Sequence, residues 1–129
     1  MLFRSIRRNY ELWVYDLQRG TKNRLVNPGN GNGNMLSADW SPDGTRVLFS
    51  SNRKGNWDIY SQAVDGSTPA QVVVEQPYDQ ILLSVAPDGT FLYRELQPKT
   101  GSDLWVRTPD GKVNPVRVTP YNEIGRAHV

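Results

Sequence analysis

Short apolar runs separated by turn residues fill most of the chain, and no stretch of a dozen residues keeps the period of an amphipathic helix. Val47–Phe49 is apolar without alternation, which is typical of a strand covered on both faces. Asp-Gly pairs punctuate the runs, and glycine at such turns tolerates a positive φ. The pattern predicts an all-β fold of short antiparallel strands joined by tight turns.

The turns and apolar runs recur in register. Ser41–Thr45 returns as Ala86–Thr90, and Asp58–Tyr60 returns as Asp103–Trp105, both at an offset of 45 residues. A period of roughly 40 to 50 residues built of short strands is typical of β-propeller blades, which are four-stranded sheets. We therefore expect strands at residues 36–40, 46–51, 58–64 and 71–74 in the first unit, and the same parts between residues 81 and 119 in the second.

A partial copy precedes the two complete units. Glu11–Trp13 matches Asp58–Tyr60, and Arg19–Gly20 stands where Asp65–Gly66 stands one unit later. The Gly- and Asn-rich segment 27–34 then predicts a loop. The chain is thus a partial propeller with two four-stranded blades and a half blade, and propellers close with about four to eight blades. The prediction assigns residues 10–26 to the half blade, 35–75 and 80–120 to the blades, and 6–123 to a fragment of a six-bladed parent. The remaining blades of that parent are expected partners of this piece.

The two ends carry a separate signal. Met1–Ser5 and Ile124–Val129 match in-frame translations of a common short-read sequencing adapter, so we predict that residues 1–5 and 124–129 are non-native. The net charge of +2 comes from 15 basic and 13 acidic residues, and leaving out Arg4 and Arg126 gives 13 of each. No run of Lys and Arg remains, so the charge pattern does not support binding to nucleic acid.

The residues that could carry catalysis are absent or repeat as structural positions. There is no cysteine, the one histidine is His128 in the suspect tail, and no serine elbow, Walker loop or kinase motif occurs. Asp43 and Asp88 stand at equivalent turns, where an aspartate accepts hydrogen bonds from nearby backbone N–H groups. Tyr60 and Trp105 hold one repeated position, which predicts packing between blades. We expect no enzyme activity, no metal, no cofactor, and no direct membrane insertion, because no apolar stretch is long enough to span a bilayer.

Binding is expected where the units differ. The loop between the second and third strands of the first complete unit offers four candidate binding residues, Arg53, Lys54, Asn56 and Trp57. The second unit has Pro98, Gly101 and Ser102 in place of Arg53, Asn56 and Trp57, and it keeps a lysine, Lys99, at the position of Lys54. Arg and Trp are enriched among the residues that dominate protein interfaces. We predict that this loop binds a protein or peptide. The alternative is an ordinary solvated loop with Trp57 folded back on its own blade.

The motif in Trp40–Thr45, Val47–Arg53, Gly55 and Asp58–Tyr60 resembles the TolB-like, or WD40-like (PD40), propeller repeat, and the resemblance covers nearly all of residues 9–123. It implies a β-propeller fold. Such repeats occur in the periplasmic translocation protein TolB, in prolyl-oligopeptidase-like peptidases and in the sensor regions of bacterial serine/threonine protein kinases. The last unit looks most like the kinase-linked propellers.

Two functions follow from this resemblance. The first is a non-catalytic module that binds or scaffolds proteins, in a periplasmic or other extracytoplasmic compartment of bacteria. The second is the sensory or gating propeller of a larger kinase or peptidase whose catalytic domain is missing. Sequence beyond either end would distinguish them.

Overall fold

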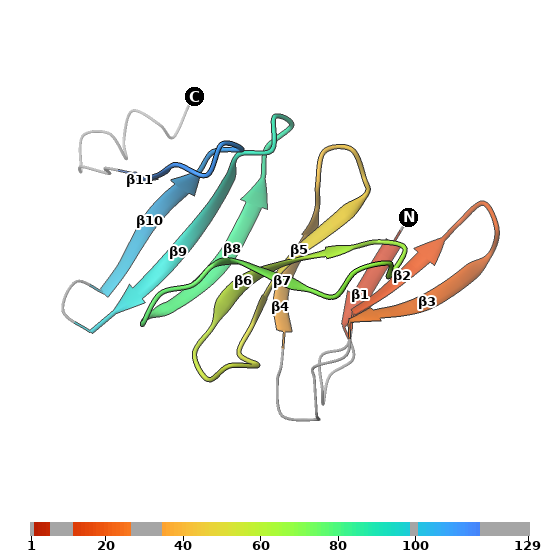
Figure 1. Cartoon of the computed structure of the whole chain (residues 1–129), viewed down its shortest axis with the longest axis horizontal. Coiled ribbons are helices and arrows are strands. Elements are labelled where there is room, and N and C mark those ends of the chain that lie inside the picture. Colours follow the sequence, from red (N-terminus) through yellow and green to blue (C-terminus); the bar gives the residue numbers. More distant parts are fainter. Residues whose placement is uncertain (1, 6–11, 27–34, 99–100, 117–129) are drawn as a thin grey trace.

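The computed structural model describes residues 2–5, 12–26, 35–98 and 101–116, and it arranges them in three antiparallel sheets that stand side by side (Figure 1). The first sheet has the order β1-β2-β3, with β1 at Leu2–Ser5, β2 at Leu12–Asp16 and β3 at Thr21–Val26. The second has the order β4-β5-β6-β7, at Met35–Trp40, Arg46–Ser51, Asp58–Ala63 and Gln71–Val74. The third, in the order β8-β9-β10-β11, is formed by Asp79–Val85, Phe91–Gln97, Gly101–Arg107 and Val113–Pro115.

The expected pair of four-stranded antiparallel sheets is confirmed, and the first sheet is larger than expected. In place of two strands it has three, because Leu2–Ser5 pairs with β2 from Leu2 opposite Tyr15 to Ser5 opposite Leu12. This strand falls in the segment expected to be non-native, and that origin remains a prediction. The loop expected at residues 27–34 lies outside the described residues.

The two complete units differ by one residue at their first turn. In the second sheet the N–H of Ser41 donates to the carbonyl of Arg46, whereas in the third the N–H of Ala86 donates to that of Thr90. Strand pairing resumes at Val47 in one unit and at Phe91 in the other. β9 is therefore offset from β5 by 44 residues, because its turn is one residue shorter, whereas the repeated motifs on either side keep the offset of 45.

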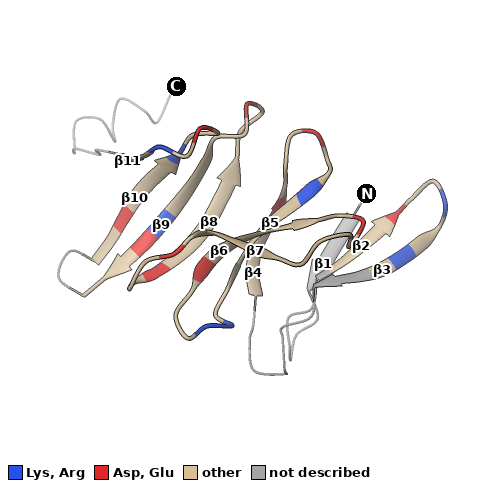
Figure 2. Ribbon diagram, viewed as in Figure 1, with Lys and Arg blue, Asp and Glu red and all other residues tan. Residues whose placement is uncertain are grey.

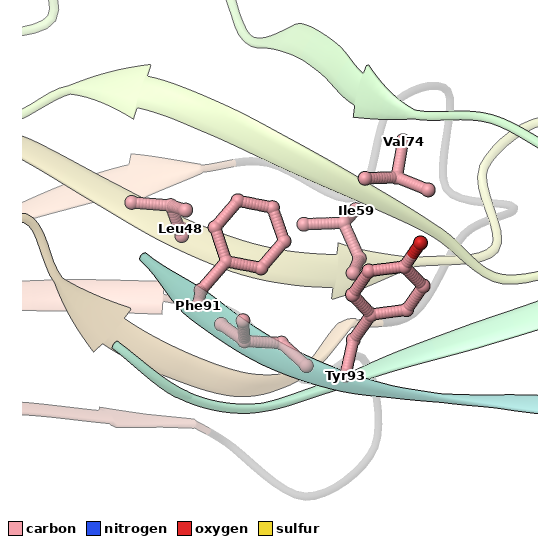
Figure 3. Close-up of a cluster of buried hydrophobic side chains, with 6 residues drawn as sticks. Leu48, Ile59, Val74, Phe91 and Tyr93 are labelled. Carbon is pink, nitrogen blue, oxygen red and sulfur yellow. The ribbon is translucent and has the colours of Figure 1, made fainter. Parts of the chain in front are cut away.

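The core consists of two clusters, one on each face of the second sheet. Met35, Val47, Phe49 and Tyr60 form the first, in which the Phe49 and Tyr60 rings stack with centroids 5.8 Å apart. The second lies between β4–β7 and β8–β11 and joins buried residues of both sheets (Figure 3): Leu48, Ile59, Val74, Leu82, Phe91 and Tyr93. Trp105 packs against this cluster and is only partly buried. The repeated aromatic position therefore serves packing in both units.

Candidate functional site

The loop Asn52–Trp57 connects β5 to β6 at one end of the second sheet, and the Asp-Gly turns lie at the opposite end (Figure 1). A turn shapes it: the N–H of Gly55 donates to the carbonyl of Asn52 at 2.9 Å, and Gly55 has a φ of 123°. Residues with a Cβ rarely adopt this backbone conformation, so the turn requires glycine. The turn presents Lys54 to solvent and directs Arg53 toward the sheet.

Arg53 lies over the aromatic pair of the first core cluster. Its Cζ is 4.7 Å from the centroid of the Tyr60 ring and 5.5 Å from that of Phe49, and its Nε donates to Ser51 Oγ at 3.2 Å. Burial lowers the pKa of the Arg53 guanidinium below its ordinary value, and the nearby Tyr60 opposes this effect. Arg53 Nη2 is buried without a hydrogen-bond partner. The guanidinium therefore covers the sheet, and contact of Arg53 with a partner remains a prediction.

Asn56 fastens the loop to the segment between β7 and β8, and Trp57 fastens it to the start of β8. Asn56 Nδ2 donates to the carbonyls of Gln76 at 2.8 Å and Tyr78 at 3.0 Å. The N–H of Trp57 donates to Asp79 Oδ1 at 2.9 Å. The carbonyl of Trp57 accepts the N–H of Gln80 at 2.8 Å. The loop and the inter-sheet segment 75–78 therefore form one surface.

Charge on this surface is mixed. Lys54 Nζ and Glu75 Oε2 are 3.4 Å apart, with both side chains about half exposed. An exposed pair of this kind contributes about 0 to 1 kcal/mol to stability. Both side chains thus remain able to contact a partner at little cost to the fold.

Asp58, directly after the loop, is a buried carboxylate with 1% exposure. It accepts a hydrogen bond from Asn56 Nδ2 at 3.4 Å. Burial raises the pKa of Asp58, while a hydrogen bond from the Gln76 backbone acts in the opposite direction. Its position behind the loop and its bond to Asn56 make it a support of the surface.

The sequence interpretation missed Tyr78. Tyr78 is 39% exposed, and its carbonyl accepts a hydrogen bond from Asn56, so its backbone lies beside the loop. The signal was an aromatic residue beside Pro77 in the segment between the two units, but nothing in the repeat indicates which loop that segment contacts. The structure brings Lys54, Asn56 and the backbones of Trp57 and Tyr78 to one end of the second sheet, and it places the Arg53 side chain on the sheet itself.

The aspartates at the opposite end act as turn residues, as the sequence indicated. Asp43 Oδ1 accepts the N–H of Thr45 at 3.0 Å, and Asp88 Oδ1 accepts that of Thr90 at 2.9 Å. These bonds lower the pKa of Asp43 and of Asp88, with the backbone N–H as the largest cause. Acidic residues are visible at the tips of the turns at this end (Figure 2).

A second concave region lies between the first and second sheets. It has a volume of about 370 Å³ and is lined by apolar and charged side chains, among them Val14, Asp16, Arg19, Val64 and Asp65. Repeat analysis could not find it, because it forms between side chains of two units. Across the described residues there is no group of three or more metal-ligating side chains and no helix able to cross a membrane.

Comparison with solved structures identifies the fold. The chain superposes on a protein described as TolB from Agrobacterium tumefaciens with a TM-score of 0.71 and 20% identity, over 88% of this chain and 43% of that one. It superposes on TolB from Acinetobacter baumannii with a TM-score of 0.72 and 20% identity, over 92% of this chain and 29% of that one. The chain therefore has the fold of part of a TolB-like β-propeller.

Sequence comparison adds one curated relative. An uncharacterized protein of Agrobacterium fabrum is 29% identical over 80 residues, which are 62% of this chain and 26% of that protein. No family model matches the chain. The chain thus spans less than half the length of each of these three proteins.

Proposed function

We propose that this chain is a non-catalytic TolB-like propeller module that binds a protein or peptide through the surface formed by loop 52–57 and segment 75–78. The TolB-like fold supports a protein-binding role in general terms. Within this surface, Trp57 and Tyr78 supply aromatic area, and Lys54 with Glu75 supplies charge of both signs. Aromatic anchors with a polar rim are typical of protein interfaces.

The single observation that carries the proposal is the fastening of the loop by Asn56. Its amide holds two carbonyls of the inter-sheet segment at 2.8 and 3.0 Å, so the surface is organised before any partner arrives. A preorganised surface loses less conformational entropy on binding than a flexible one. The loop of the third sheet carries no aromatic residue at the position of Trp57, where Ser102 stands.

The test uses peptides selected from a random library on the immobilised chain. Trp57→Ala is expected to weaken binding of the selected peptides by about 1 to 3 kcal/mol, which is roughly 5- to 150-fold. Lys112→Ala, an exposed change at the opposite end, serves as the matched control and should leave binding unchanged. Equal affinity of the Trp57→Ala variant and the unmodified chain would exclude this surface.

The same proposal extends to the cellular compartment of the protein and to whether a catalytic domain is attached to it. The TolB-like fold favours an extracytoplasmic compartment, and the longer relatives leave room for further domains. The alternative, a sensory or gating propeller of a kinase or peptidase, predicts a catalytic domain in the flanking genomic sequence. Reading that sequence distinguishes the two, because a secretory signal without a catalytic domain supports the binding module alone.

A further inference from the structure

A glutamate is buried in the third sheet at a position where the second sheet has a serine. Glu95 lies on β9 two residues beyond Tyr93, on the face that packs against the second sheet, and it is 6% exposed. Glu95 pairs across the strands with Gln80, and Ser51 pairs in the same way with Met35. The repeat therefore forms this part of the sheet without a charged residue.

Two side-chain amides hold the Glu95 carboxylate. Gln80 Nε2 donates to Glu95 Oε2 at 3.0 Å, and the Gln97 amide donates to Glu95 Oε1. Across the described residues, no lysine or arginine forms an ion pair with Glu95. A buried carboxylate is costly unless hydrogen bonds compensate for its lost hydration. The two amides are thus what makes the buried glutamate tolerable.

The Gln80 side chain is satisfied at only one of its two polar atoms. Gln80 is fully buried, and its Oε1 has no hydrogen-bond partner within the described part of the chain. A buried polar atom without a partner costs free energy, which a methionine at this position would avoid. The Gln80–Glu95 pair is therefore a poor choice for stability alone, and this points to a role beyond stability.

The Gln80 backbone connects this buried pair to loop 52–57. The N–H of Gln80 donates to the carbonyl of Trp57 at 2.8 Å, and Asp79 Oδ1 accepts the N–H of Trp57 at 2.9 Å. Both backbone groups of Trp57 are thus held by the start of β8. Because the backbone determines the direction of the Cα–Cβ bond, this contact fixes the direction in which the Trp57 side chain leaves the loop.

We propose that Glu95 and Gln80 are positioning residues that orient Trp57 for binding. The carboxylate fixes the Gln80 side chain, and the Gln80 backbone in turn fixes the loop. This inference rests on the proposed binding surface at loop 52–57 and deepens it, because a residue pair inside the next sheet then controls the affinity of that surface. By linkage, a bound partner also stabilises the contact between β8 and the loop.

The test replaces the pair by apolar side chains of nearly the same shape. In the full 129-residue chain, Gln80→Met combined with Glu95→Met removes the amide and the carboxylate together, and such a double replacement can leave stability unchanged or raise it. Peptides selected on the unmodified chain should nevertheless bind roughly 3- to 10-fold more weakly, because the loop must be ordered on binding. Titrations with the peptides and urea denaturation separate the two effects.

Hydrogen exchange reports on the loop without any peptide. The backbone N–H groups of Trp57 and Gln80 should exchange roughly 3- to 10-fold faster in the double variant, because the bonds that protect them open more often. Glu95→Gln retains an acceptor oxygen for the Gln80 amide, so it should restore both exchange and affinity to within about twofold of the unmodified chain.

The matched control is another buried glutamine at the opposite end of the second sheet. Gln62 is 7% exposed, and its Nε2 donates to the carbonyl of Thr68 at 2.8 Å. Gln62→Met removes a hydrogen bond of the same kind and should change neither peptide affinity nor exchange in the loop. An effect of Gln62→Met as large as that of the double variant would overturn the inference, because the loss would then be general.

The two measurements separate this inference from the proposed function. Unchanged exchange of the Trp57 and Gln80 N–H groups in the double variant would overturn the inference whatever the peptides do. Faster exchange without loss of affinity would overturn the inference alone if Trp57→Ala still weakens peptide binding. If Trp57→Ala leaves binding unchanged as well, the binding surface itself is wrong and the inference fails with it.

Discussion

The second and third sheets are built from the same repeated unit, yet they differ in how completely they are buried. In β5, Val47 and Phe49 are fully buried and Leu48 is 9% exposed, so both faces of the strand are covered. In β9 the pattern alternates: Phe91, Tyr93 and Glu95 are buried, Leu92 is partly buried, and Arg94 is exposed. The second sheet is therefore buried on both faces, whereas the third sheet is buried on the face that packs against the second sheet.

The largest expected effect is a difference between the two repeated aromatic residues. Tyr60→Ala should lower the free energy of unfolding by about 3 to 5 kcal/mol, because it leaves a cavity in the first core cluster. Trp105→Ala should cost less, about 1 to 3 kcal/mol, because Trp105 is only partly buried. Urea denaturation measures both values.

The Tyr60→Phe substitution separates the contribution of the ring to stability from that of the hydroxyl. Tyr60 Oη is buried without a hydrogen-bond partner, so its removal should leave stability unchanged or slightly raised. Equal losses for Tyr60→Ala and Trp105→Ala would contradict the unequal burial of the two sheets.

The second prediction concerns the hydrogen bonds between the sheets. Asp39→Ala should destabilise the chain by about 1 to 3 kcal/mol, because the N–H of Val85 loses its acceptor at a partly buried position. Ser84→Ala is the matched control at the equivalent position of the third sheet, and it should change stability by less than about 0.5 kcal/mol. Thermal melts of both variants test the contrast, and a Ser84→Ala loss as large as that of Asp39→Ala would refute it.

The third prediction concerns the guanidinium that covers the second sheet. Arg53→Ala should lower stability by about 1 to 2 kcal/mol through loss of its contact with the Tyr60 and Phe49 rings. Lys54→Ala, at an exposed neighbouring position, should change stability by less than about 0.5 kcal/mol. If Arg53→Ala weakens peptide binding without any loss of stability, Arg53 contacts the partner directly, and its packing on the sheet is unimportant.

The smallest expected effect is a pH dependence of opposite sign in two aspartates. Burial raises the pKa of Asp58 above its ordinary value of 3.8, so its stabilising contribution is present below that pH and is lost as the pH rises through the raised pKa. The pKa of Asp43 is lowered by the N–H of Thr45, so its contribution is present above 3.8 and is lost as the pH falls.

Substitution by asparagine tests both signs. As the pH rises from about 3 to about 7, Asp58→Asn should gain stability relative to the unmodified chain, whereas Asp43→Asn should lose it. Urea denaturation across this pH range gives both differences. A parallel pH trend in the two variants would show that burial of Asp58 does not control its ionisation.

Strands and turns follow from local chemistry that is readable in the sequence. Proline and glycine preset the turn at Ser41–Thr45, Asp43 completes it with bonds two residues away, and the apolar centre of β5 predicts burial on both faces. The 45-residue repeat predicted the two four-stranded sheets for the same reason, since each unit carries its own turns.

Only the tertiary structure decided where the loop side chains that differ between the two units lie. The repeat could not show that the second turn closes one residue earlier, because that depends on which carbonyl Ala86 bonds. It could not place Arg53 on Tyr60, or Asn56 on the carbonyls of Gln76 and Tyr78, about 20 residues away. Packing and desolvation determine which partner a long side chain contacts once the sheets have assembled. These forces act between residues that are far apart in the sequence.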